Sequence, residues 1–96
     1  MTNEINKARI VVLGGAESGV GAAVLAKVKG FDVFLSDCGT IKEEYASTLR
    51  EWDIPFEEGG HSENLILNAD EVVKSPGIPE TAPMIQALRA QGTHIV

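Results

Sequence analysis

The segment Arg9-Ile-Val-Val-Leu-Gly-Gly-Ala-Glu-Ser-Gly-Val-Gly21 decides the fold of this 96-residue chain. Its first five residues form a continuously apolar, β-branched run, which is typical of a parallel strand buried on both faces. A glycine-rich turn follows, and from Gly19 to Gly30 the apolar residues have helical spacing on one face, namely Val20, Ala23, Val24 and Val28. A strand, a tight turn and a helix in this order predict the first unit of a parallel α/β sheet.

The alternation of strands and helices continues along the rest of the chain. Further strands are predicted at residues 32–36, 55–58, 71–74 and 93–96. A second helix is predicted after a capping box formed by Thr40 and Glu43, a short third one around residues 62–67, and a last one capped by Thr81 with Pro83 in its first turn. In the second helix the apolar residues Ile41, Tyr45, Leu49 and Trp52 recur at spacings of about one turn. The predicted fold class is therefore α/β, a Rossmann-like open parallel sheet of about five strands with helices on both faces, in one domain spanning residues 1–96.

Composition and charge argue against several classes of function. The net charge is −6, from 14 acidic and 8 basic residues, and the basic residues are scattered along the sequence. Nucleic-acid binding depends on clustered Lys and Arg, so DNA and RNA are not expected partners. No apolar run approaches the roughly 18 residues that cross a bilayer, and residues 1–7 are too polar for a signal peptide. The single cysteine, Cys38, excludes an internal disulfide and fits a cytoplasmic protein.

The glycine-rich turn is the main candidate for a binding site. Gly14, Gly15, Ala16, Glu17, Ser18 and Gly19 connect the first strand to the first helix. Free main-chain N–H groups and the positive dipole end of a helix start favour a phosphate there. Ala16 occupies the middle-glycine position of the dinucleotide-binding pattern, and its methyl group restricts how closely a phosphate can approach. The alternative is a turn that needs glycine for its geometry alone.

Two further segments follow predicted strands at their carboxyl ends, where open α/β sheets bind ligands. Asp37 ends the second strand and suits a ribose hydroxyl, or else it caps the turn at Cys38, Gly39 and Thr40. Cys38 itself is predicted to be a buried or half-buried filler rather than a nucleophile. Ser75, Pro76 and Gly77 follow the fourth strand, either as a rigid binding turn with an accessible Gly77 N–H or as a simple connector.

No reaction centre is evident in the sequence. His61 and His94 lack metal-ligand spacing, so no metal site is predicted, and surface or strand-end positions are expected for both. Glutamates 43, 44, 57 and 58 are interpreted as solvated, with no paired acid–base site, and no catalytic residue is assigned. The ATP-binding pattern G-x-x-x-x-G-K-[ST] is absent from these 96 residues.

Taken together, the glycine turn at residues 14–21, Asp37 and the segment Val73-Lys-Ser-Pro-Gly-Ile78 resemble the Mur ligase family, and within it the members that add D-glutamate. The resemblance covers essentially the whole chain but only the first of three domains. It implies a cytoplasmic, ATP-dependent ligase of peptidoglycan synthesis whose N-terminal domain binds the UDP part of UDP-N-acetylmuramoyl-L-alanine. It also implies that ATP and Mg²⁺ bind to the central domain, with no cofactor in this part and no catalysis by this part alone.

The resemblance also implies roles for individual residues. Glu17, Ser18 and Gly19 would line the diphosphate and uridine site, Asp37, Cys38 and Gly39 would hold the uracil edge, and Ser75, Pro76 and Gly77 would close the pocket. The chain departs from the family pattern at Ala16 and at the short Cys38-Gly39 pair, which affects side-chain roles more than the place of the pocket. Two alternatives remain open: an NAD-type dinucleotide-binding domain of an oxidoreductase or regulatory protein, and a Rossmann-like interaction domain that binds no ligand.

Overall fold

The computed structural model describes residues 7–96. The prediction that the N-terminus is not a signal peptide concerns residues that lie almost wholly outside this range. Within the described residues, no helix combines the length and the apolar character needed to span a membrane.

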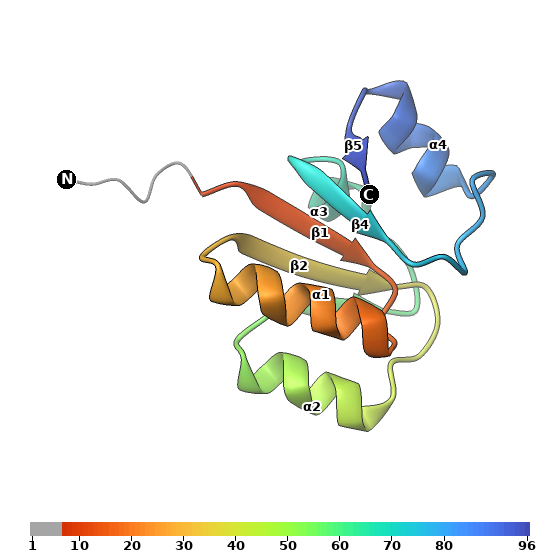
Figure 1. Cartoon of the computed structure of the whole chain (residues 1–96). Coiled ribbons are helices and arrows are strands. Elements are labelled where there is room, and N and C mark those ends of the chain that lie inside the picture. Colours follow the sequence, from red (N-terminus) through yellow and green to blue (C-terminus); the bar gives the residue numbers. More distant parts are fainter. Residues whose placement is uncertain (1–6) are drawn as a thin grey trace.

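Five parallel strands form one sheet in the order β3-β2-β1-β4-β5, which confirms the predicted fold class (Figure 1). The five strands are β1 (Arg9–Leu13), β2 (Asp32–Asp37), β3 (Phe56–Glu58), β4 (Glu71–Lys74) and β5 (His94–Ile95). Each lies within about two residues of its prediction, because β-branched runs bounded by glycine and polar residues mark strand ends locally.

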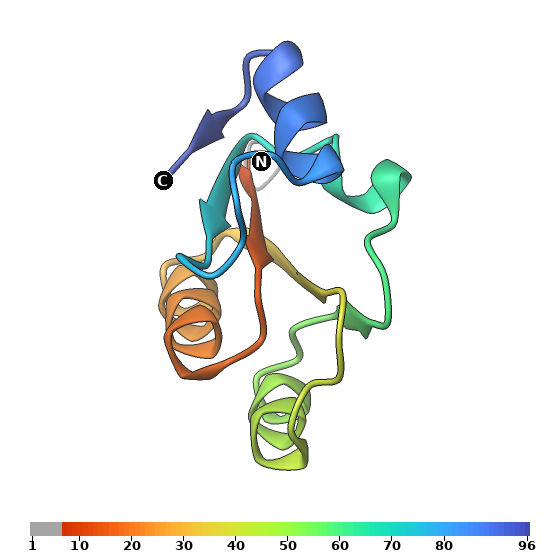
Figure 2. The same cartoon turned by 90° about the vertical axis from the view of Figure 1, so that its right-hand side faces the viewer.

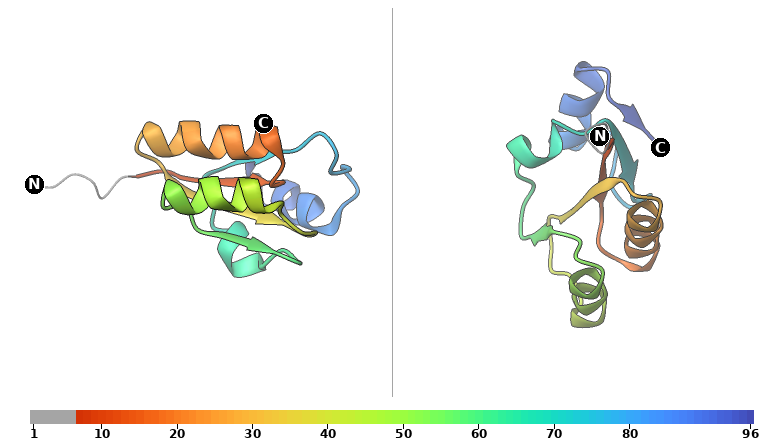
Figure 3. Two further views of the ribbon diagram at one scale, coloured as in Figure 1. Left: turned by 90° about the horizontal axis from the view of Figure 1, so that it is seen from below. Right: turned by 90° about the vertical axis from the view of Figure 1, so that its left-hand side faces the viewer.

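Helices cover both faces of the sheet, as the alternation predicted (Figures 2 and 3). On one face lie α1 (Glu17–Val28) and α2 (Glu43–Glu51), and on the other lie α3 (Glu63–Ile66) and α4 (Pro83–Ala90). Strand β1 shows why two cores are possible. Ile10 and Val12 belong to the cluster beneath α1 and α2, whereas Val11 and Leu13 belong to the cluster beneath α3 and α4. A strand alternates its side chains between faces, so an unbroken apolar run supplies both cores.

The strand order places a switch in direction at β1. The chain moves from β1 outward through β2 to β3, and then crosses to β4 on the other side of β1. Loops that leave β1 and β4 therefore diverge from a common edge, and open α/β sheets bind ligands at such an edge. The residues after β1, β2 and β4 are the three segments that the sequence singled out.

Some predicted helix boundaries were wrong, and two regularly spaced apolar residues are exposed. Helix α2 begins at Glu43 with Lys42 at its N-cap, so Thr40 forms no capping box, and Ala82 rather than Thr81 precedes α4. Pro83 does stand in the first turn of α4. Val28 is 62% exposed and Trp52 is 42% exposed, although the sequence groups each with the regularly spaced apolar residues of its helix. Val28 is the last residue of α1, and Trp52 is the C-cap residue that follows α2, so helical spacing did not bring burial at these helix ends.

Candidate functional site

The glycine turn after β1 is held in a conformation that two of its glycines permit. Gly14 has φ +115°, and its N–H donates to the Ser36 carbonyl oxygen over 2.9 Å. A Cβ added at Gly14 would lie 2.7 Å from the Ser75 Cβ. A Cβ added at Gly19 would lie 1.9 Å from the Gly14 carbonyl oxygen. The helix start therefore approaches the turn more closely than any side chain allows, as predicted for Gly19.

Main-chain donors remain free at the start of α1. Ala16 is the N-cap residue and supplies no side-chain cap. Among residues 7–96, no hydrogen bond uses the N–H groups of Ala16, Glu17 or Ser18. The first N–H groups of a helix have no partner within it, and they stand at the positive end of its dipole. This end of α1 therefore has the donors and the polarity that an anion requires.

Asp37 connects the glycine turn to the loop after β2. Its Oδ2 accepts a hydrogen bond from the Gly15 N–H at 2.7 Å, and its Oδ1 accepts one from the Gly39 N–H at 2.8 Å. The second bond is the turn-capping arrangement that stood as the alternative interpretation of Asp37. Both carboxylate oxygens thus hold main chain, and the predicted contacts of Asp37 with ribose or uracil would add to this bracing role.

The segment after β4 is fixed mainly by its own main chain. The Ser75 N–H donates to the Leu13 carbonyl oxygen at 2.9 Å, which joins this loop to the end of β1. The Gly77 N–H, expected to be accessible, instead donates weakly to the Ser75 Oγ at 3.3 Å. Lys74 Nζ donates to the Ile78 carbonyl oxygen at 2.8 Å and holds the far side of the turn. Three hydrogen bonds thus hold the loop, and the Gly77 N–H that was expected to be accessible is already used within it.

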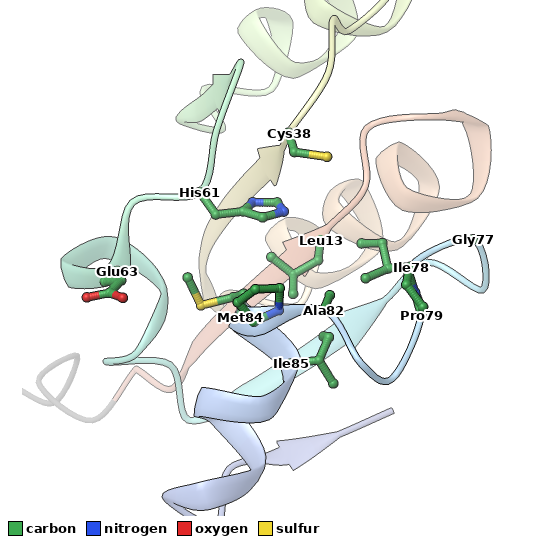
Figure 4. Close-up of a pocket in the computed structure, with 11 residues that line it drawn as sticks. Leu13, Cys38, His61, Glu63, Gly77, Ile78, Pro79, Ala82, Met84 and Ile85 are labelled. Carbon is green, nitrogen blue, oxygen red and sulfur yellow. The ribbon is translucent and has the colours of Figure 1, made fainter.

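Two adjoining pockets lie at this edge of the sheet. The smaller, of about 140 Å³, contains six of the predicted site residues, together with His61 and Ile78; the six are Gly14, Gly15, Ala16, Asp37, Cys38 and Ser75. The larger, of about 470 Å³, extends over the start of α4 and is mostly apolar (Figure 4). Cys38, His61 and Ile78 line both pockets. Gly77 lines the larger one, whereas Glu17, Ser18, Gly19, Gly39 and Pro76 line neither.

Cys38 was predicted to be buried or half-buried, and this was wrong. Its thiol is exposed at the end of β2 and borders both pockets. The strand ends at Asp37, so the residue after it leaves the packed sheet for the loop.

The sequence did not identify His61 as a site residue. Its ring contacts the fully buried Ser36 hydroxyl, with 2.7 Å between the Ser36 Oγ and the His61 Nδ1. The same hydroxyl lies 2.8 Å from Glu57 Oε2 and 3.3 Å from the Gly60 carbonyl oxygen. A serine within the apolar run of β2 was the available signal, because a fully buried hydroxyl needs polar partners.

Glu57 was interpreted as solvated, and the structure shows that it is half-buried in this polar network. Its carboxylate accepts hydrogen bonds from the Ser62 N–H at 2.8 Å and from the Ser62 hydroxyl at 2.6 Å. Burial of the carboxyl raises its pKa, but the hydrogen bonds from Ser62 and Ser36, together with the nearby His61, outweigh burial and lower the pKa of Glu57 below its usual value. Glu58 is also engaged, since its Oε1 accepts from the Ile41 N–H at 2.7 Å.

The other polar residues considered from the sequence play structural parts. His94 Nδ1 lies 2.7 Å from Glu71 Oε2 on the β4–β5 edge, away from both pockets. Glu43 pairs with Arg50 along the surface of α2. In the described part of the chain, no three His, Cys, Asp or Glu side chains are grouped so that they could hold a metal ion.

A family model described as "MurD N-terminal domain" matches residues 7–84. The chain belongs to the MurD N-terminal domain family. It is 64% identical over 88 residues to the UDP-N-acetylmuramoylalanine--D-glutamate ligase of Bacteroides fragilis strain ATCC 25285, and 61% identical over 88 residues to that of Bacteroides thetaiotaomicron. Each match covers 92% of this chain and 20% of the relative, so the chain spans about a fifth of the length of these relatives.

The fold of this chain also matches that of a solved Mur ligase structure. The UDP-N-acetylmuramate-alanine ligase MurC from Thermotoga maritima superposes with a TM-score of 0.76 at 26% identity, over 91% of this chain and 20% of that one. The resemblance to Mur ligases that the sequence motifs indicated is thereby confirmed. The dinucleotide-binding alternative is not favoured, because the relatives that match at 61% and 64% identity are named as ligases.

Proposed function

We propose that this chain binds the UDP moiety of UDP-N-acetylmuramoyl-L-alanine, as the N-terminal domain of an ATP-dependent ligase that adds D-glutamate in peptidoglycan synthesis. The observation that carries the proposal is the set of free N–H groups at the start of α1, which lies at the switch in strand order of a MurD N-terminal domain. The relatives are named for a UDP-linked substrate, and a diphosphate is the anion that such a helix start favours.

The proposed ligand extends along the carboxyl edge of the sheet. Its diphosphate lies against the N–H groups of residues 16–18, and the rest of the molecule occupies the two adjoining pockets. Asp37 keeps the glycine turn in place through Gly15, and Ser75 limits the space beside Gly14. The proposal assigns the chain binding and not catalysis.

ATP and Mg²⁺ belong, in this proposal, to parts of the ligase outside these 96 residues. The described residues do not fit a magnesium ion, because no cluster of acidic or other metal-ligating side chains is present among them. No ATP-binding loop stands in the sequence. The cytoplasmic location implied by the resemblance remains a prediction.

Nuclear magnetic resonance of the chain with added UDP tests the proposal. We expect amide signals of residues 14–19, 37–39 and 75–78 to shift with UDP and to shift much less with NAD. The absence of shifts at millimolar UDP and millimolar UDP-N-acetylmuramoyl-L-alanine would contradict the proposal.

A matched pair of variants tests the role of the N–H groups. Proline is tolerated at the first position of a helix, and the extended Ala16 (φ −93°, ψ −168°) suits a residue that precedes proline. Glu17→Pro therefore deletes one free N–H without breaking α1, while Glu17→Ala removes the same carboxylate and keeps the N–H. We expect UDP affinity about tenfold or more weaker in the proline variant than in the alanine variant, since an N–H bonded to a charged group contributes about 1.5–3 kcal/mol. Equal UDP affinities of the two variants would show that the phosphate does not bind to the N–H groups of this turn.

A further inference from the structure

The hydroxyl of Ser36 has more acceptors around it than it has protons. Ser36 is fully buried, and its Oγ lies 2.8 Å from Glu57 Oε2, 3.3 Å from the Gly60 carbonyl oxygen and 2.7 Å from His61 Nδ1. A serine hydroxyl donates one hydrogen bond and can accept two. An ionised carboxylate and a carbonyl can only accept. The proton of Ser36 therefore goes to the nearer and ionised acceptor, Glu57, and the short contact with His61 must be one in which the Ser36 oxygen accepts.

That requirement fixes the tautomer of His61. The short contact between Oγ and Nδ1 is favourable only if Nδ1 carries a hydrogen and donates it to Ser36. The opposite arrangement would place the hydroxyl oxygen 2.8 Å from a carboxylate oxygen with no hydrogen between them. Glu57 stays ionised because it also accepts from the N–H and the hydroxyl of Ser62. In the neutral ring the lone pair is then on Nε2.

The Nε2 side of the ring is available to a ligand. His61 is half-buried and lines both pockets, and Figure 4 shows its ring extending from its loop toward the space between Cys38 and Leu13. No hydrogen bond joins Nε2 to any residue in the described range 7–96. A lone pair held in that position attracts a neutral N–H or O–H donor and repels a phosphate oxygen. The carboxylates of Glu63 and Asp37, which also line these pockets, act against a phosphate there as well.

We propose that His61 is a specificity-determining residue of the nucleotide site, whose Nε2 accepts a hydrogen bond from a neutral hydroxyl or N–H donor of the ligand. Ser36 and Glu57 are the positioning residues that hold its tautomer. The inference rests on the proposed UDP-binding function and assigns a contact beside the diphosphate rather than to it. The donor belongs either to the nucleoside or to the sugar-peptide part, and the two ligands of the test distinguish these sources.

The ring tautomer is measured first, without ligand. Long-range ¹H–¹⁵N correlation spectra of the histidine rings, recorded near pH 8 where an ordinary histidine is neutral, report which nitrogen carries the hydrogen. We expect His61 to carry it on Nδ1, and Ser36→Ala to convert this state into a mixture of tautomers. A spectrum dominated by hydrogen on Nε2 would overturn the inference whatever the chain binds.

Binding is measured next with a matched pair of variants. In His61→Asn the amide can replace Nδ1 toward Ser36 but has nothing at the Nε2 position, whereas in His61→Gln the amide oxygen can reach that position. We expect His61→Asn to weaken the affinity for UDP-N-acetylmuramoyl-L-alanine about tenfold, the effect of one net hydrogen bond, and His61→Gln to recover part of the loss. Binding of inorganic pyrophosphate should stay within about twofold of that of the unchanged chain.

The outcomes separate the inference from the function on which it rests. An equal loss with UDP alone would assign the donor to the nucleoside, and a loss only with UDP-N-acetylmuramoyl-L-alanine would assign it to the sugar-peptide part. Full affinity in His61→Asn for both ligands would overturn the inference and leave the proposed function intact. Failure of the unchanged chain to bind either ligand would overturn the proposed function and the contact with it.

Discussion

The two halves of the carboxyl edge of the sheet are built by different means. Around β1 and β4 the site consists of main chain, with a glycine turn, free N–H groups and a hydrogen-bonded Ser-Pro-Gly loop. Around β2 and β3 it consists of side chains, where Ser36, Glu57 and His61 hold one another. Main-chain sites depend on backbone conformation, which a few glycines specify locally. Side-chain networks depend on strands that meet only in the folded sheet, so the two halves should respond differently to substitution.

The largest effect on the free energy of unfolding is expected from a substitution at Gly19. In Gly19→Ala the new methyl carbon would lie 1.9 Å from the Gly14 carbonyl oxygen, so α1 or the turn must move. Because backbone cannot yield as a side chain does, we expect a loss of about 3 kcal/mol or more in the free energy of unfolding, measured in urea. Gly21→Ala is the matched control. Its Cβ meets nothing within 4 Å, and alanine in a helix should stabilise by about 0.5–1 kcal/mol. Similar unfolding free energies for the two variants would contradict the close approach of the Gly19 Cα to the Gly14 carbonyl oxygen.

A smaller loss of unfolding free energy is expected at Asp37, which joins the two halves of the site. Asp37→Ala removes the acceptors of both the Gly15 and the Gly39 N–H groups, and Gly15 is buried. An unpaired buried donor costs about 1–3 kcal/mol, so we expect a decrease of about 2 kcal/mol in unfolding free energy, again from urea unfolding. Glu17→Ala serves as the control, since the Glu17 carboxylate is exposed and makes no hydrogen bond within residues 7–96. It should cost less than about 1 kcal/mol. An Asp37 variant as stable as this control would show that the bracing is unimportant.

The smallest effect concerns Glu57 and depends on pH. The pKa of Glu57 is lowered in the folded state, so its contribution to stability is present above the unfolded-state pKa, about 4.3, and is lost as the pH falls through the folded-state value. We expect Glu57→Gln to cost about 1 kcal/mol at pH 7, and to make stability fall less steeply below about pH 4.3 than in the unchanged chain. Thermal unfolding from pH 7 to pH 3 measures this.

The control for Glu57 is Glu44→Gln, because Glu44 is exposed and its carboxylate has no hydrogen bond among the described residues. Its pH profile should match that of the unchanged chain. Parallel profiles for Glu57→Gln and the unchanged chain would contradict the network on the β2–β3 side.

Prediction from the sequence succeeded where the cause is local. The run at residues 9–13 predicted a strand buried on both faces, and Gly14 and Gly19 predicted the turn and the close helix packing. Prediction was less accurate at helix starts. Thr40 and Thr81 have the side chains of N-caps, but the helices begin later, at Glu43 and Pro83. A cap depends on the backbone angles of the residues that follow, and composition does not specify these.

The amino-acid sequence by itself determined the strand–helix alternation and the glycine turn, because each depends on residues that are neighbours along the chain. It also determined the membership in a ligase family, because the motifs at residues 14–21, 37 and 73–78 can be recognised in the sequence without knowing how they meet in space. Only the tertiary structure decided which side chains complete the site. Ser36 and His61 are 25 positions apart, and they meet because β3 pairs with β2 and so brings its own following loop to the same edge of the sheet. The exposure of Val28 and Cys38 was decided in the same way, since burial depends on what the rest of the chain covers and not on a residue's own character.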